Sequence, residues 1–365
     1  MSCAAQLTIS CPAIAANYRL LAQQVNGKQV AAAVKANAYG LGVAQIAPVL
    51  KAAGCTFYYV ASLEEATQLR GIVGTEPDIA VLHGIAARDH AIATEHRLIP
   101  VLNDLGAIQE WHIHAQQHKL FQPVIIHLDT GMNRLGLSKD DIDELLTHPD
   151  WFNGLKILLW LSHLACADDQ NNPMNAQQQH LFTKFLIKLP LAPLSFANSS
   201  GIFLGSNYHF DQVRPGCALY GINPTPGRIN PMQPVVRLEA PILQLRDLTP
   251  WVTVGYGASW RSKRLGKAAT LPVGYADGFM RSLSNRGLTY CSGHPAPVIG
   301  RVSMDLIVID VTDVPDEHRQ PGTMVELIGA HQDVDALAMQ ADTISYEILT
   351  QLGSRYQRVY EGRET

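Results

Sequence analysis

A single lysine, Lys35, ends a nearly continuous apolar run in the segment QVAAAVKANAYG, residues 29–40. A lysine amine that is shielded from water has a lowered pKa, and the neutral amine is the nucleophile needed for Schiff-base chemistry with a carbonyl compound. The same position would also suit a lysine that extends from a strand end into solvent. On this residue alone, both interpretations stay open.

Two later segments carry small polar residues of the kind that bind phosphate. Asn198 and Ser199 lie in FANSSG, and Arg214, Gly216 and Cys217 lie in VRPGCALYG. Backbone N–H groups and small hydroxyls bind phosphate in the last two loops of many parallel barrels, although the same residue types also dominate ordinary turns. A lysine and a phosphate cradle in one barrel mouth would together indicate a phosphorylated aldehyde cofactor.

The elements that must position these side chains follow a repeating pattern, in which a short apolar run precedes an amphipathic helical stretch. The predicted strands cover residues 29–35, 57–61, 79–82, 99–102, 124–128, 157–161, 194–197 and 218–220. Helical patterns between them include residues 43–53, 63–71, 140–147 and 176–188. This alternation predicts an N-terminal (β/α)8 barrel of the TIM type, with a doubly wound open sheet as the main alternative.

The pattern changes after a proline-rich loop at residues 223–233. Short strands separated by Gly, Pro, Asp and Ser then predominate, and helical patterns return only at residues 334–340 and 344–352. The predicted strands of this part cover residues 235–236, 242–245, 268–272, 296–298, 306–311 and 324–328. We therefore predict an α/β protein with a barrel domain at 1–232 and a mainly-β domain at 233–365.

Composition excludes several classes of protein. The 365 residues are 47% hydrophobic and carry 28 basic against 32 acidic side chains, a net charge of −4. A disordered chain is less hydrophobic, and nucleic-acid binding needs clustered Lys and Arg, which are missing here. The six cysteines form no CxxC pair, the start has no secretory signal pattern, and no apolar run is long enough to span a membrane. We expect no metal site, no membrane or nucleic-acid partner, and a cytoplasmic location.

Eight short segments, in their order and approximate spacing, resemble the alanine racemases. They are AVKANAYG (33–40), DTGMNRLG (129–136), SHLA (162–165), ANSSG (197–201), VRPGCALYG (213–221), VGYGASW (254–260), LPVGYADGFMRSL (271–283) and GRVSMD (300–305). The resemblance covers nearly the whole chain. The fold of that family, a barrel followed by a β domain, agrees with the elements predicted above.

The resemblance implies that Lys35 carries pyridoxal 5'-phosphate and that the enzyme interconverts L-alanine and D-alanine by two-base proton transfer at Cα. Lys35 and Tyr256 match the two bases, which act on opposite faces of the substrate. His163 and Arg214 match the groups that lower the pKa of this tyrosine, and Arg214 also matches the partner of the pyridine nitrogen. Further matches concern the rest of the cofactor site, namely Tyr39, Asn198, Ser199, Gly216, Cys217 and Tyr346.

For the substrate, the resemblance implies that Arg134 and the backbone of Met304 bind the carboxylate and that Tyr275 lies at the entrance. Tyr256, Tyr275 and Met304 belong to the predicted β domain, whereas Lys35 belongs to the barrel. In the family these two halves of a site come from different subunits. The resemblance therefore implies a homodimer with shared active sites, in which the domain at 233–365 supplies the second base to its partner.

The sequence departs from the family pattern at His127, where many members carry a carbamylated lysine that braces the arginine. We hypothesise that neutral His127 accepts a hydrogen bond from Arg134, because a strand period of two places it on the same side as Asp129. Leu41 and Ser303 also differ from the residues expected beside family motifs. These departures bear on the range of substrates more than on the type of reaction.

Other functions remain open at this point. A racemase of serine, lysine or another amino acid would keep the fold and the cofactor, and a non-catalytic carrier of pyridoxal phosphate would lack a role for Tyr256. A decarboxylase is disfavoured, because decarboxylases of this barrel fold usually place an acidic residue where Arg214 stands. The supply of D-alanine for peptidoglycan and the catabolism of alanine both use the same chemistry.

Overall fold

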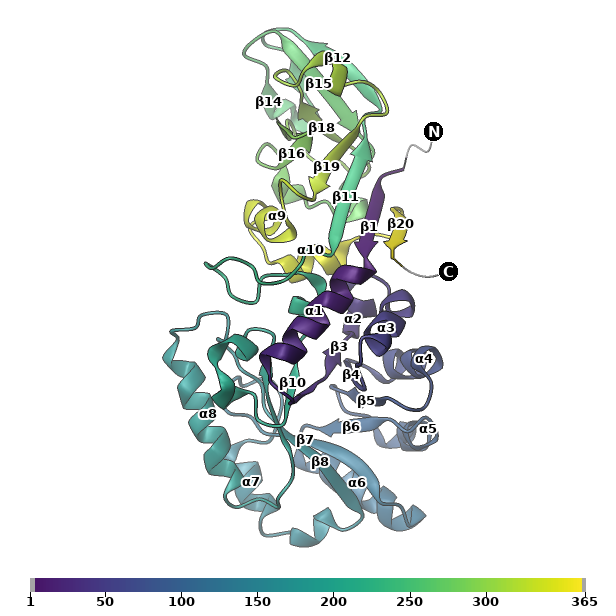
Figure 1. The fold of residues 1–365 in the computed structure, drawn as a ribbon, viewed down its shortest axis with the longest axis vertical. Helices are drawn as coiled ribbons and strands as arrows, with labels where there is room; N and C mark the ends of the chain where they lie inside the picture. Colours follow the sequence, from purple (N-terminus) through teal and green to yellow (C-terminus); the bar gives the residue numbers. More distant parts are fainter. Residues whose placement is uncertain (1–3, 363–365) are drawn as a thin grey trace.

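A computed structural model describes residues 4–362 and has an elongated shape with two parts (Figure 1). A barrel of parallel strands surrounded by helices forms one part, and sheets of mostly antiparallel strands form the other. Within the described residues, no helix combines the length and the hydropathy needed to cross a membrane. The predicted fold class, a TIM-like barrel followed by a mainly-β domain, is confirmed.

The barrel is one parallel sheet of nine short strands in the order β2-β10-β9-β8-β7-β6-β5-β4-β3. The two end strands, β2 and β3, are consecutive pieces of the segment 29–33, so the sheet closes on itself. The strands are β2 (Gln29–Val30), β3 (Ala32–Ala33), β4 (Phe57–Val60), β5 (Asp78–Val81), β6 (Ile99–Leu102), β7 (Gln122–His127), β8 (Leu155–Leu161), β9 (Leu194–Asn198) and β10 (Gln212–Arg214).

Helices with one apolar face cover the barrel. The first of them, α1, is capped by Ser10, whose hydroxyl accepts a hydrogen bond from the N–H of Ala13. It buries Ile14, Tyr18 and Leu21, which are spaced along one helix face. These helices are α1 (Cys11–Gln24), α3 (Val43–Ala52), α4 (Leu63–Val73), α5 (His90–Glu95), α6 (Leu105–His118), α7 (Lys139–Leu145) and α8 (Pro173–Leu186). The short segment α2 (Lys35–Tyr39) differs from them, because most of its residues have positive φ.

The second part contains a six-stranded, a three-stranded and a two-stranded sheet, with two helices beside the barrel. Its strands are β11 (Val236–Pro241), β12 (Gln244–Leu248), β13 (Thr253–Val254), β14 (Trp260–Arg261), β15 (Gly266–Leu271), β16 (Leu288–Cys291), β17 (His294–Pro297), β18 (Ile307–Asp310), β19 (Met324–Ile328) and β20 (Gln357–Glu361). The helices are α9 (Val334–Ala341) and α10 (Ser345–Gln351).

The first strand of the chain, β1 (Gln6–Ser10), lies in the sheet of the β domain. It pairs antiparallel with β11 and parallel with β20, so the first and last described strands of the chain lie side by side (Figure 1). The predicted barrel range of 1–232 therefore differs from the structure at its start. Strand β1 buries its three central residues, Leu7, Thr8 and Ile9, so both of its faces are covered at the centre.

The eighth strand was predicted at the wrong place. Residues 218–220 belong to a short 3₁₀ helix (Cys217–Tyr220), and the strand is β10 (Gln212–Arg214). Pro215 has no N–H with which to continue a ladder, and the N–H groups of Gly216 and Ala218 bond to the hydroxyl of Ser199 at 2.9 and 3.3 Å. The apolar run of residues 218–220 is buried as a helical turn beneath the barrel mouth.

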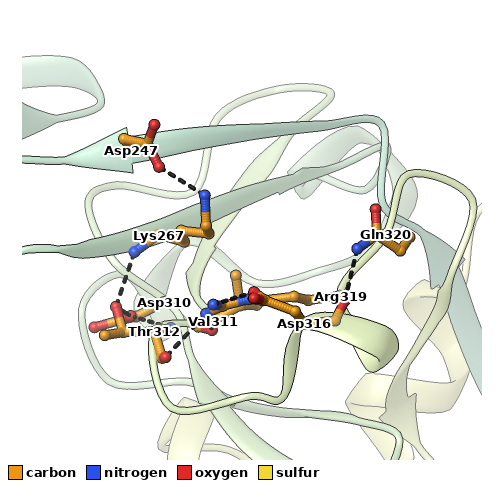
Figure 2. A network of polar contacts seen from close by, with 8 residues as sticks. All are labelled: Asp247, Lys267, Asp310, Val311, Thr312, Asp316, Arg319 and Gln320. Carbon is orange, nitrogen blue, oxygen red and sulfur yellow. Dashed lines mark hydrogen bonds and ion pairs between the residues drawn. The ribbon is translucent and has the colours of Figure 1, made fainter.

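A polar network fastens the loop after β18 to the three-stranded sheet (Figure 2). The guanidinium of Arg319 donates to the carbonyl oxygens of Val311 and Thr312 at 2.6 and 2.9 Å and pairs with Asp316. On the neighbouring strand, the Lys267 ammonium pairs with Asp247 at 2.7 Å in a much more exposed position. Arg319 therefore satisfies backbone acceptors of the loop, whereas Lys267 makes an ordinary surface ion pair.

We expect Arg319→Ala to lower the free energy of unfolding by about 1–3 kcal/mol, because the partly buried carbonyl of Thr312 loses its donor and that of Val311 keeps only the N–H of Val314, at 3.2 Å. Lys267→Ala is the matched control and is expected to cost less than about 1 kcal/mol, as exposed pairs usually do. Urea unfolding of both variants measures the difference. Equal midpoints for the two would contradict this account of the network.

Candidate active site

Strand periodicity brings several polar side chains to one end of the barrel. Alternate residues of the strands fill its interior, where Ala31, Ala33, Phe57, Tyr59, Ala80, Ile99, Val101, Ile125, Leu159 and Leu161 form one cluster. Two residues beyond the last cluster member of their strands stand Lys35, Asn103, His127 and His163. Because successive residues of a strand alternate between faces, these side chains cap the barrel interior at the carboxyl ends of its strands.

The amine of Lys35 is half-buried in this layer. Burial is the largest cause that lowers its pKa, and the positive charge of Arg134 lowers it further, whereas Glu65 acts in the opposite direction. A lowered pKa increases the fraction of neutral amine near pH 7. Lys35 therefore has the environment that a covalent attachment to an aldehyde and a later role as a base both require.

Arg214, at the end of β10, is buried in the barrel without a carboxylate partner among the described residues. Its Nη1 donates to the hydroxyl of Ser195 at 2.6 Å, and its Nη2 donates to the carbonyl of Ser162 at 2.6 Å. The ring of Tyr59 lies 5.9 Å from the guanidinium carbon. Burial lowers the pKa of Arg214 to about 10, which still leaves the side chain cationic at neutral pH.

His163 is fixed by the same arginine. Nη2 of Arg214 lies 3.2 Å from Nδ1 of His163, and because arginine has only donors, Nδ1 must accept. Burial, followed by the charge of Arg214, holds the pKa of His163 well below its ordinary value. The imidazole is therefore neutral and carries its proton on Nε2.

The loops after β9 and β10 meet as the sequence predicted, although β10 begins earlier than expected. The hydroxyl of Ser199 joins them through the N–H groups of Gly216 and Ala218, and Asn198 accepts a hydrogen bond from Gly201 at 2.9 Å. A Cβ atom at Gly216 would lie 2.2 Å from the hydroxyl oxygen of Tyr39. Only glycine leaves this corner open.

Tyr346, on helix α10, reaches the same corner from the other side. Its hydroxyl lies 2.9 Å from the sulfur of Cys217, and its ring lies 6.0 Å from that of Tyr39. Burial raises the pKa of Tyr39, of Tyr346 and of the Cys217 thiol. All three groups are therefore neutral near pH 7, and the two hydroxyls can donate hydrogen bonds to an anion.

The donor set in the barrel mouth fits pyridoxal phosphate. One end offers hydroxyls and a glycine corner suited to a phosphate, and the other end offers the fixed charge of Arg214. Nε of Arg214 makes no hydrogen bond with a described residue, so one N–H remains for a ring nitrogen. Lys35 supplies the amine that an aldehyde needs.

Three predicted site residues lie elsewhere, on the β domain. Tyr256, Met304 and Tyr275 are 72%, 54% and 44% exposed. The backbone of Tyr275 donates to Ser303 at 3.0 Å, which places it beside Met304, and the loop of Tyr256 packs against residues 300 and 301. Within residues 4–362, no hydrogen bond connects these three side chains to the barrel mouth.

Arg134 lies at the mouth, in the loop between β7 and α7, with an exposed side chain. Burial is the largest cause of the lowered pKa values of Lys35, His127 and His163, and the charge of Arg134 lowers all three further. Its side chain makes no hydrogen bond with another described residue. A guanidinium of this kind is available to a carboxylate.

His127 is bound differently from the hypothesis derived from the sequence. Its Nδ1 lies 2.9 Å from Oδ1 of Asn103, and Nδ2 of Asn103 donates to the carbonyls of Leu82 and Val101 at 2.9 and 3.2 Å. The amide is thereby oriented, so Nδ1 of His127 must be the donor. No described hydrogen bond joins His127 to Arg134.

Sequence reasoning missed three residues that shape the mouth. Asn103 directly follows a predicted strand, and this position could have identified it. Ser195 lies inside the predicted seventh strand, where a small polar residue gives no functional signal. Glu65, on α4, accepts hydrogen bonds from the N–H groups of Ala36 and Ala61 at 2.6 and 2.8 Å, and only the tertiary structure reveals these contacts.

We expect His127 to remain neutral down to about pH 4, because burial and the charge of Arg214 lower its pKa to about 4. The unfolded chain takes up a proton near pH 6.5, so this histidine should weaken folding progressively as the pH falls below 6.5. Carbon-13 NMR of histidine-labelled protein measures the titration, and the signal lost in His127→Gln gives the assignment. Titration near pH 6.5 would show that the site is not shielded.

Two family models match the chain. "Alanine racemase, N-terminal domain" covers residues 9–224, and "Alanine racemase, C-terminal domain" covers residues 235–360. The alanine racemase of Acidiphilium cryptum is 48% identical over 353 residues, which are 97% of this chain and 98% of that relative. The alanine racemase of Rhodospirillum rubrum is 44% identical over 98% of this chain and 96% of its own length.

Solved structures of alanine racemases have the same fold as this chain. The alanine racemase of Bartonella henselae, crystallised with covalently bound pyridoxal phosphate, superposes with a TM-score of 0.95 at 43% identity, over 98% of this chain and all of the other. The biosynthetic alanine racemase of Pseudomonas aeruginosa superposes with a TM-score of 0.92 at 32% identity, over 99% of this chain and all of the other. The two family models and these relatives show that the chain belongs to the alanine racemase family, whose members are pyridoxal-phosphate-dependent isomerases.

Proposed function

We propose that this protein interconverts L-alanine and D-alanine with pyridoxal phosphate attached to Lys35. The observation that carries the proposal is the pairing of a half-buried amine of lowered pKa with the carboxylate-free, buried guanidinium of Arg214 in one barrel mouth. The same amine serves to hold the cofactor and, once released from it, to move a proton.

Tyr39, Ser199, Gly216, Cys217 and Tyr346 line the corner that would hold the phosphate of the cofactor, and Asn198 and His163 would lie beside the rest of it. When bound, pyridoxal phosphate withdraws electron density and makes the Cα–H bond of an amino acid acidic. The protein's own residues decide which bond breaks and where the proton goes. The neutral hydroxyls and the open glycine corner described above support this assignment.

Arg214 limits side reactions because its guanidinium keeps its positive charge and its proton. Its Nε–H would bind the pyridine nitrogen, and a guanidinium would not deliver its proton there because it remains charged throughout the physiological range. By leaving that nitrogen unprotonated, Arg214 would favour return of a proton to the substrate carbon over competing reactions. The three hydrogen bonds from Nη1 and Nη2 to Ser195, Ser162 and His163 support this role, since they fix the side chain in the barrel.

Two bases are needed because racemisation removes a proton from one face of Cα and returns one to the other. Lys35 serves one face and Tyr256 the other. Tyr256 is 72% exposed on the β domain of its own chain and makes no described hydrogen bond with the mouth. We therefore infer a homodimer in which the β domain, residues 233–365, supplies Tyr256 to the barrel of the partner.

The substrate is held by its carboxylate. The guanidinium of Arg134 and the N–H of Met304 bind the two oxygens, and Tyr275 lines the entrance. Met304 and Tyr275 lie next to each other on the β domain, which supports the proposal that the partner subunit supplies both to the same site. We place the activity in the cytoplasm. Cys55 and Cys217 are free thiols that make hydrogen bonds in this structure, and a reducing compartment keeps thiols in this form.

Incubation of L-alanine with purified, cofactor-loaded protein in heavy water tests the proposal. We expect D-alanine that carries deuterium at Cα, with Tyr256→Phe slowed about 10²- to 10⁴-fold as for the loss of a general base. Chiral chromatography with mass detection measures both isomers, and serine and lysine in parallel rank the substrates.

Faster conversion of serine or lysine would make the protein a racemase of another amino acid. No D-isomer from any amino acid, with borohydride still trapping the cofactor on Lys35, would contradict the proposal and favour a carrier.

A further inference from the structure

The turn that follows Lys35 has an unfavourable backbone. Ala36, Asn37, Ala38 and Tyr39 are four successive residues with positive φ, of 51°, 53°, 55° and 54°. For residues with a side chain this left-handed conformation brings Cβ too close to the following carbonyl, and a run of four such residues requires support from its surroundings. Helix α2 is thus a left-handed turn that the rest of the molecule must hold.

The barrel holds the start of this turn. Oε1 of Glu65 accepts the N–H of Ala36 at 2.6 Å, while Oε2 accepts the N–H of Ala61 at 2.8 Å. The side chain of Asn37 accepts the N–H of Val43 at 2.8 Å and so begins the next helix. These contacts leave the carbonyls of Gly40 and Leu41, at the end of the turn, to other partners.

The last strand of the chain supplies those partners. Nη1 of Arg358 donates to the carbonyl of Gly40 at 2.6 Å, and the hydroxyl of Tyr360 donates to the carbonyl of Leu41 at 2.8 Å. Arg358 and Tyr360 are two residues apart on β20 and so lie on the same face of the strand. Two side chains of one strand therefore bind two successive carbonyls, about 320 residues away along the chain.

Arg358 also binds the helix that carries Tyr346. Its Nη2 donates to the carbonyls of Leu352 and Gly353 at 3.1 and 3.4 Å, directly after α10. The approach between α10 and the turn is close, because a Cβ atom at Gly40 would lie 2.4 Å from the carbonyl oxygen of Leu349. One guanidinium thus joins the turn bearing Lys35 and Tyr39 to the helix bearing Tyr346.

We propose that Arg358 and Tyr360 are positioning residues for the cofactor site, through which the C-terminal strand holds Lys35, Tyr39 and Tyr346 in one arrangement. Neither side chain reaches the mouth itself, so both act through the left-handed turn. The inference rests on the proposed function in one respect, namely that pyridoxal phosphate is the group held there. It predicts that the affinity for the cofactor depends on a strand outside the barrel.

The fork of the guanidinium matters more than its charge. It donates in two directions at once, to Gly40 and to the carbonyls after α10, whereas a lysine has a single nitrogen at its end. Arg358→Met removes both sets of hydrogen bonds, Arg358→Lys keeps the charge, and Tyr360→Phe removes one hydrogen bond with little change of shape. Gln357→Ala, at an exposed position of the same strand, is the matched control.

The test measures cofactor binding rather than turnover. Full-length protein is freed of cofactor and titrated with pyridoxal phosphate, and the visible absorbance and borohydride trapping on Lys35 report occupancy. We expect Arg358→Met to raise the dissociation constant about tenfold or more, as the loss of charged hydrogen bonds implies. Tyr360→Phe and Arg358→Lys should raise it less, and Gln357→Ala should bind as the wild type does.

Two outcomes separate this inference from the proposed function. If the wild-type protein binds and traps the cofactor while Arg358→Met and Tyr360→Phe bind it equally tightly, the positioning role is overturned and the proposed function stands. If the wild-type protein fails to bind the cofactor, the proposed function fails first. Should Arg358→Met fold poorly by circular dichroism, the milder Tyr360→Phe decides.

Discussion

A buried positive charge without a carboxylate partner dominates this structure. Taking a guanidinium out of water is costly unless its donors are satisfied, and here Ser195, the Ser162 carbonyl and His163 bind Nη1 and Nη2 of Arg214. The charge itself remains uncompensated. Burial, followed by this charge, lowers the pKa values of His127 and His163, which stay neutral as a result. Together with Arg134 and Lys35, the charge of Arg214 makes the barrel mouth a place where a phosphate and a carboxylate are favourable.

Two geometric devices bring Lys35 to this mouth. Strand periodicity carries the inward direction of Ala31 and Ala33 on to Lys35, and a register shift of one residue would turn the lysine toward the helices. The left-handed turn that follows then returns the chain so that the hydroxyl of Tyr39 meets Gly216. The first device is local to the barrel, whereas the second is held by hydrogen bonds from a strand at the far end of the chain.

The sequence allowed the barrel, the β domain and most helices to be predicted, because their periodicity is local. Strand β1 was not predicted, since its partners β11 and β20 are more than 200 residues away along the chain. The eighth strand was misplaced because the apolar residues 218–220 resemble a strand, whereas the geometry of Pro215 and Gly216 makes them helical. In the candidate site, motifs indicated Lys35 and Arg214, but the orientation of Asn103 depends on carbonyls of two other strands.

We propose that one active site needs two chains, because Lys35 lies in the barrel mouth and Tyr256 is exposed on the β domain. Mixed dimers of Lys35→Ala and Tyr256→Phe chains test it directly. Each variant alone should be nearly inactive, and random reassociation should restore about a quarter of wild-type activity, since half of the dimers then hold one intact site. A mixture no more active than the separate variants would contradict shared sites and show that each chain must complete its own.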